Sequence, residues 1–279
     1  MGHLQEDKLH ELLHHPAVQG GLVPFVVALI TAELLQRLRL SDLAVVAAFA
    51  ATAYLVSGLP FDTLTASHRL LWLGLLSPLV AISLGLLNAA WVRPLLAAAG
   101  GAAAIWMAEH ILQHQVPAAV FLWSAGIALY VGWLVFWMDE LQYSPVRAAS
   151  AGLALGLGTG LSALFGASAL LGMYGLSLGA AAGAYLLIQM LTNNRLPCGH
   201  SFTLPLALIA GLIGCLAVLT ARLPWYALIA LAAIPPVARI PVSEKSVLWL
   251  QSILLSAATL FCAAVAVYLT WRVAGMPPL

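Results

Sequence analysis

Histidines are the residues of this chain best suited to bind a metal ion. His110 and His114 are four residues apart, so one helix would present both imidazoles on the same face. Two such imidazoles suit Zn²⁺ or Cu²⁺ when a third ligand completes the site. Glu109 and His68 are the candidates for that third ligand. The simpler interpretation is that these histidines lie at helix ends near lipid headgroups and bind nothing.

Catalytic motifs do not accompany these histidines. The sequence contains no zinc-protease signature, P-loop, nucleophile elbow or dinucleotide fingerprint. It therefore favours a protein that is not an enzyme, without deciding the question. The 11 Lys and Arg residues nearly balance the 10 Asp and Glu residues, so no excess charge favours nucleic acid as a partner.

The composition is that of a membrane protein. Hydrophobic residues make up 63% of the 279 residues and charged residues 8%, where soluble domains carry about 25% charged residues. Apolar stretches of about 20 residues recur, each long enough to cross a hydrocarbon layer of roughly 30 Å. The sequence predicts an all-α, polytopic, multi-pass protein of the inner (plasma) membrane, surrounded by lipids. Other membrane subunits are a further class of partner.

The helices that would position any functional residue can be located by taking Pro, Gly and charged residues as their boundaries. About ten membrane helices result, at 18–38, 42–60, 69–90, 93–112, 116–138, 146–166, 168–192, 202–221, 223–240 and 246–272. Residues 1–17 form a polar, His-rich segment with amphipathic spacing. Connections on one side of the membrane carry seven Lys and Arg against four on the other, which predicts that both termini lie outside.

An internal repeat is suggested by two short matches. Residues 51–56 (ATAYLV) match 182–187 (AGAYLL), and residues 128–133 match 266–271. Both matches place the first five-helix half, 18–140, over the second half, 141–279. Because five is an odd number, such a repeat would be inverted, and coincidence in an Ala- and Leu-rich chain is the alternative. The layout alone resembles the five-plus-five transporters, such as the drug/metabolite transporter superfamily, which implies a substrate site between the halves.

Glycine stripes mark two helices as tightly packed. In lipid, helices associate through close approach, so glycines on one face let two backbones meet. We predict helix packing through Gly152, Gly156, Gly160, Gly175, Gly179 and Gly183. A seam that slides, or a contact with another subunit, would use the same glycines.

Prolines inside apolar stretches are candidates for a substrate path, because each frees a backbone carbonyl. They are Pro24, Pro78, Pro205, Pro235 and Pro236, and packed kinks are the alternative. Charged residues are nearly absent from the middle of the predicted spans, which disfavours a carboxylate proton relay.

Three functions follow from these features. The first is a transporter or facilitator for a small neutral or amphipathic solute. The second is a non-catalytic subunit or assembly factor of a larger membrane complex. The third is a metal-handling protein that uses the histidines.

Overall fold

The computed structural model describes residues 15–37, 40–58, 65–85, 87, 91–114, 116–166, 168–221, 223–242 and 247–274. Within these ranges every regular element is a helix. The elements are η1 Val18–Leu22, α2 Val23–Gln36, η2 Ser41–Leu43, α3 Ala44–Ser57, α4 Ala66–Gly85, α5 Val92–Leu112, α6 Pro117–Asp139, η3 Glu140–Tyr143, α7 Pro145–Phe165, α8 Ala169–Thr192, α9 His200–Thr220, α10 Trp225–Ala232, α11 Ile234–Val237 and α12 Leu248–Ala274. The predicted N-terminal segment falls, but for its last three residues, outside the described residues.

Eight helices in the described part of the chain are long and apolar enough to cross a membrane. The all-helical prediction is confirmed for the described residues, and these eight helices support a multi-pass membrane protein. Two of the ten predicted spans are shorter helices, Ser41–Ser57 and Trp225–Val237. At 1.5 Å per residue these reach roughly 25 and 20 Å, less than the hydrocarbon thickness of about 30 Å.

Local sequence explains where several helices begin and end. Pro117 and Pro145 occupy the first turns of α6 and α7, where a missing N–H costs no hydrogen bond. Gly58 ends α3 with a φ of 67°, a conformation that glycine adopts without strain. Asn193 ends α8 in the left-handed helical region, with a φ of 48°.

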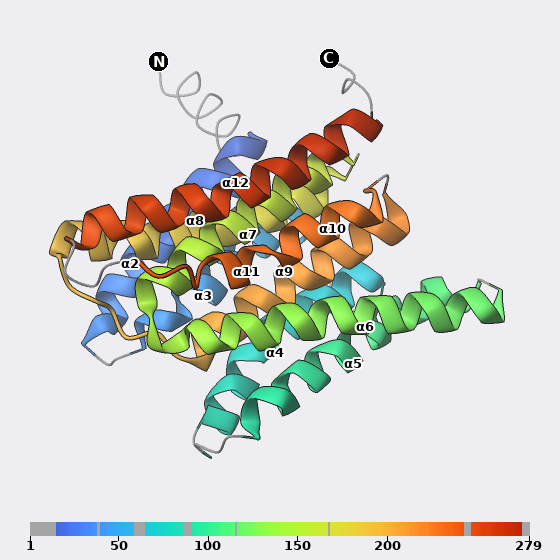
Figure 1. Cartoon of the computed structure of the whole chain (residues 1–279), viewed down its shortest axis with the longest axis horizontal. Coiled ribbons are helices and arrows are strands. Elements are labelled where there is room, and N and C mark those ends of the chain that lie inside the picture. The colour runs from blue at the N-terminus through green and yellow to red at the C-terminus, as the bar shows by residue number, and fades with distance from the viewer. Residues whose placement is uncertain are drawn as a thin grey trace, which may run out of the picture.

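The centre of the protein is formed by α7, α8 and α9 (Figure 1). In the most apolar stretch of α9, 89% of the residues are buried. Only 28% are buried in the corresponding stretches of Val18–Gln36, Pro117–Tyr143 and α12. Helix α12 lies across α7, and α5 and α6 pack together at the periphery. The outer helices therefore direct most of their apolar side chains toward lipid.

Glycines set the distance between α7 and α8. A Cβ atom added to Gly156 would lie 2.2 Å from the backbone nitrogen of Gly179. A Cβ atom added to Gly175 would lie 2.5 Å from the Cα atom of Gly160. The two backbones are thus in direct contact, as expected where small residues alone allow helices to approach in lipid.

One end of each stripe, at Gly152 and at Gly183, meets side chains instead. A Cβ atom added to Gly152 would lie 2.4 Å from Cδ1 of Leu206 in α9. A Cβ atom added to Gly183 would lie 3.3 Å from Cδ1 of Leu153. Gly158, which is on neither stripe, packs against Leu231 and against Ala263 of α12. The α7 helix is therefore held closely on three sides.

Replacing a glycine at this crossing tests how much the close approach stabilises the fold. We expect Gly156→Ala to lower the free energy of unfolding in detergent micelles by about 1–3 kcal/mol, because backbone atoms must move apart. Gly126→Ala is the matched control, since an added Cβ atom at Gly126 has no neighbour within 4 Å. Equal stability of the two variants would contradict the proposed role of the crossing.

Candidate functional site

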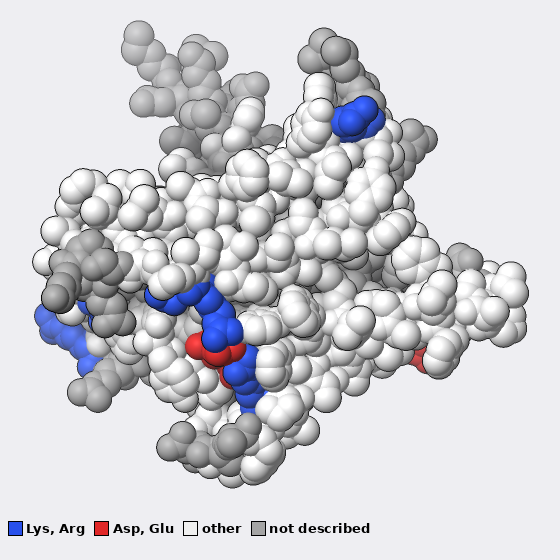
Figure 2. All heavy atoms as spheres, viewed as in Figure 1, with Lys and Arg blue, Asp and Glu red and all other residues white. Residues whose placement is uncertain are grey.

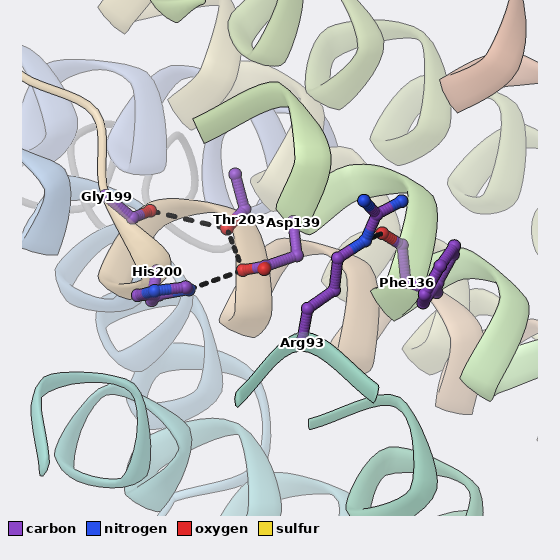
Figure 3. A network of polar contacts seen from close by, with 6 residues as sticks. All are labelled: Arg93, Phe136, Asp139, Gly199, His200 and Thr203. Atoms are coloured by element: carbon purple, nitrogen blue, oxygen red, sulfur yellow. Dashed lines mark hydrogen bonds and ion pairs between the residues drawn. The ribbon is translucent and has the colours of Figure 1, made fainter. Parts of the chain in front are cut away.

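Helix α6 ends in two adjacent carboxylates that serve different partners. Asp139 is 1% exposed, and its Oδ1 lies 2.5 Å from Nδ1 of His200, the first residue of α9. The hydroxyl of Thr203 donates to the same oxygen at 3.5 Å and to the carbonyl of Gly199 at 3.3 Å. Figure 3 shows these groups converging from α6 and the start of α9. Oδ2 of Asp139 has no partner among the described residues.

The chain before α9 is fixed beside this pair. Tyr185 of α8 donates its hydroxyl to the carbonyl of Pro197. Burial raises the pKa of the Cys198 thiol, and the carboxylates of Asp42 and Asp139 raise it further. A thiol in this state stays protonated at neutral pH, which makes it a poor nucleophile and a poor metal ligand.

Glu140, the second carboxylate, holds two arginines. Its Oε2 lies 2.5 Å from Nη2 of Arg93, and its Oε1 lies 2.8 Å from Nη2 of Arg239. Arg147 donates to the backbone carbonyl of Arg239 at 3.1 Å. We call Arg93, Arg147, Arg239 and Glu140 the arginine cluster. Three guanidinium charges against one carboxylate leave a net charge of +2.

Aromatic rings of α6 support the arginine cluster. The guanidinium carbon of Arg93 lies 3.7 Å from the centroid of the Phe136 ring, and that of Arg239 lies 4.9 Å from Trp137. Arg93 also donates through Nε to the carbonyl of Phe136 at 2.9 Å (Figure 3). These contacts hold the arginines against α6 with their charges at the surface. Figure 2 shows the charged atoms as a strip where α6 and α11 end.

An apolar groove of about 1150 Å³ lies between α6 and the helices α9, α10 and α11. Leu122, Gly126, Tyr130 and Trp133 line it from α6, and their spacing of four and three residues places them on one helix face. Helix α10 contributes Ile229 and its neighbours. The surface is recessed between α6 and α10 in Figure 2. Among the described residues that line the groove there is no Asp, Glu, Lys or Arg.

Two polar groups interrupt the apolar lining. Pro236 has no N–H, so the Ala232 carbonyl lacks its usual helical donor, and Nε1 of Trp133 donates to it at 3.0 Å. This hydrogen bond joins α10 to α6 beside the groove. The hydroxyl of Tyr130 is buried and has no partner in the described part of the protein.

The five predicted path prolines lie in different settings. Pro24 follows the π-helical turn η1 at the start of α2, and Pro78 and Pro205 are buried within α4 and α9. Pro235 and Pro236 lie where α10 passes into α11, and Pro236 alone among these five lines the groove.

The histidines predicted to bind metal do not form a complete ligand set in the described residues. Glu109 pairs with Arg69 at 3.1 Å, and Nδ1 of His114 lies 2.9 Å from the carbonyl oxygen of His110. The two imidazole rings are 5.3 Å apart, and His68 lies in the first turn of α4. The described residues contain no group of three or more His, Cys, Asp or Glu placed to hold a metal ion.

Comparison with known proteins gives no further guide to function. No protein-family model matches the chain, and no curated protein matches its sequence. The groove and the polar groups at its end are therefore the features from which function is inferred.

The residues around Asp139 and Glu140 were not predicted as a site. A usable signal was present, because two adjacent carboxylates follow an apolar span while several arginines lie on the same predicted side of the membrane. The sequence could not show that Arg93, Arg239 and Glu140 meet, since they come from three separate segments, which are α5, the turn after α11 and η3.

The pairing of His200 with Asp139 can be tested by removing one partner. We expect His200→Ala to lower the free energy of unfolding by about 3 kcal/mol, because a buried carboxyl then loses its partner. The double variant His200→Ala/Asp139→Asn should recover part of that loss, since a neutral amide needs no ionic partner.

Chemical denaturation in detergent micelles measures both effects. His114→Ala is the matched control. His114 is exposed at the end of α5, so its replacement should change the free energy of unfolding little. If His200→Ala is as stable as His114→Ala, the pair does not stabilise the fold.

Proposed function

We propose that the protein is a transporter or facilitator for an amphipathic solute, which enters sideways from the bilayer through the groove. The observation that carries this proposal is the groove itself. Helix α6 belongs to the first half of the chain, and α9, α10 and α11 belong to the second half. A site between two halves is the usual position of the substrate in secondary transporters.

The lining of the groove suits a substrate with a long apolar part. Carbon atoms provide nearly all of its surface, and Leu122 and Ile229 are largely exposed within it. In a folded soluble protein such a surface would be a site for another apolar molecule. Without charged groups along the groove, passive movement is favoured over coupling to protons.

A movable wall is supported by the structure of α10 and α11. The pair Pro235–Pro236 interrupts the helix, so Trp225–Val237 is short and has a break in its hydrogen bonds. The Trp133–Ala232 hydrogen bond is the polar link between this segment and α6 that the structure shows. Breaking one such bond would allow α10 to move away from α6 and widen the groove.

The wider architecture is part of the same proposal. Helix α3 packs against α8, and α4 packs against α9, as the members of an inverted repeat would about a two-fold axis. In such a repeat α2 would correspond to α7, and α6 to α12. The contact between α7 and α12 is extensive, and no comparable contact joins α2 to α6 among the described residues. We place the arginine cluster on the cytoplasmic side, because Lys and Arg are enriched there.

A second candidate function is that of a subunit in a larger membrane complex. The large side chains exposed in the groove, including Leu122 at 73%, would then contact a helix of a partner subunit. Such a helix would occupy the groove permanently, and the partner would co-purify with this chain.

Filling the groove tests the transport proposal. We expect vesicles containing the wild-type protein to move a fluorescent short-chain lipid between leaflets at least about tenfold faster than protein-free vesicles, a barrier difference of about 1.4 kcal/mol. Gly126→Trp should return the rate to the protein-free value, because Gly126 lines the groove and has open space beside it.

Gly21→Trp is the matched control, since Gly21 is equally open but lies in η1, away from the groove. Wild-type vesicles that are no faster than protein-free vesicles would overturn the proposal. Equal slowing by the two substitutions would show that the groove is not the path.

A further inference from the structure

We infer that the groove and the arginine cluster together bind one lipid with a phosphate headgroup. The headgroup lies on the arginine cluster, and the apolar tail lies along α6 in the groove. This inference rests on the proposed function and specifies its substrate class. It follows from two features, which are the continuity of the two surfaces and the positive charge at one end.

The arginine cluster begins where the groove ends. On α6, Trp133 lines the groove, and Trp137, one turn later, contacts Arg239. The Trp133 and Trp137 rings are 5.4 Å apart. On the opposite wall, Val237 lines the groove and Arg239 follows two residues later. A molecule in the groove therefore reaches the guanidinium groups within about one helical turn.

The charge of the arginine cluster favours an anion as ligand. Glu140 neutralises one of three guanidinium charges, and Arg239 remains 42% exposed in its side chain. Guanidinium groups bind phosphate oxygens through paired, charge-assisted hydrogen bonds, and the rings of Phe136 and Trp137 already hold two of them in place. A lipid phosphodiester carries one negative charge, so on this cluster it would lower the net charge from +2 to +1.

Unpartnered donors lie along the same path. Nε1 of Trp137 is buried and has no hydrogen-bond partner among the described residues. The Tyr130 hydroxyl, in a side chain only 9% exposed, lacks one as well and is part of the groove lining. Both atoms have almost no accessible surface, so a lipid oxygen would reach them only if a neighbouring side chain moved.

The length of the groove suits one lipid tail. Leu122 and Trp133 are eleven positions apart on α6, which corresponds to roughly 16 Å along the helix axis. A membrane lipid tail spans half of a hydrocarbon core of about 30 Å, so its length is similar. The occupant is thus a lipid of the surrounding membrane rather than a free phosphate compound.

Equilibrium binding tests this inference without any need for transport. Delipidated wild-type protein in neutral detergent is titrated with phosphatidylglycerol or with diacylglycerol of the same chains, which lacks the phosphate, and bound lipid is counted by native mass spectrometry. We expect phosphatidylglycerol to bind at least about tenfold more tightly, the effect of one charge-assisted hydrogen bond. Inorganic phosphate alone, at the concentrations used for lipid, should not displace it.

Two variants change the charge of the arginine cluster in opposite directions. Arg93→Gln/Arg239→Gln should abolish the preference for phosphatidylglycerol, and Glu140→Gln should strengthen it. Arg272→Gln is the matched control, because Arg272 lies in the last turn of α12 and belongs to no part of the cluster. Gly126→Trp should weaken binding of both lipids by filling the groove.

The outcomes separate this inference from the proposed function. Equal binding of the two lipids, or a preference that survives Arg93→Gln/Arg239→Gln, would overturn the phosphate site. Weaker binding of phosphatidylglycerol by the Glu140→Gln variant would also contradict it. This second test still applies if the double variant fails to fold. A protein helix found in the groove would exclude the lipid. Failure of transport with intact lipid selectivity would overturn the transport proposal alone.

Discussion

Backbone contact between α7 and α8 is the interaction on which the rest of the structure depends. Gly156 and Gly160 of α7 meet Gly175 and Gly179 of α8 at distances that no side chain would allow. In a bilayer, apolar surface gains little by moving from lipid into protein, so dispersion and close packing must hold the helices together. Glycine costs about 1 kcal/mol in a soluble helix, and here that cost is offset by this close approach.

The tight centre determines what is left open at the edge. Helix α9 packs against α7, α4 and α6 and is buried almost throughout, whereas α10 and α11 contact α6 over a short length. Because Pro235 and Pro236 stop the helix early, the second wall of the groove is short, and an apolar space remains beside α6. The charged residues lie where α6, α11 and the start of α5 come together.

Much of the fold could be predicted from the sequence, and the site could not. Apolar stretches and breaks at Pro and Gly locate the helices, because in lipid each backbone must satisfy its own hydrogen bonds. The stretches around Ser41–Ser57 and Trp225–Val237 were expected to span, and the helices that form there are shorter than the eight candidate spans, so the count of ten stays a prediction. Composition shows that a segment is apolar, and the point where its helix stops depends on residues such as Gly58 and Pro235.

The candidate site depends on contacts between distant parts of the chain. Spacing within one helix suggested His110 and His114 as ligands, and Glu109 instead pairs with Arg69 from another helix. Asp139 and His200 are 61 positions apart, and no local pattern links them. The prolines were considered for freed carbonyls, and Pro236 frees the carbonyl of Ala232 that Trp133 then binds. The sequence does not show that Trp133 supplies the N–H donor to this carbonyl.

The most direct test is an experimental structure of the protein in a lipid bilayer disc that contains phosphatidylglycerol. The account predicts elongated density along α6 from Trp133 toward Leu122, with its head on Arg93 and Arg239. A groove closed by α10 packing directly onto α6, or one filled by a helix of another subunit, would contradict it.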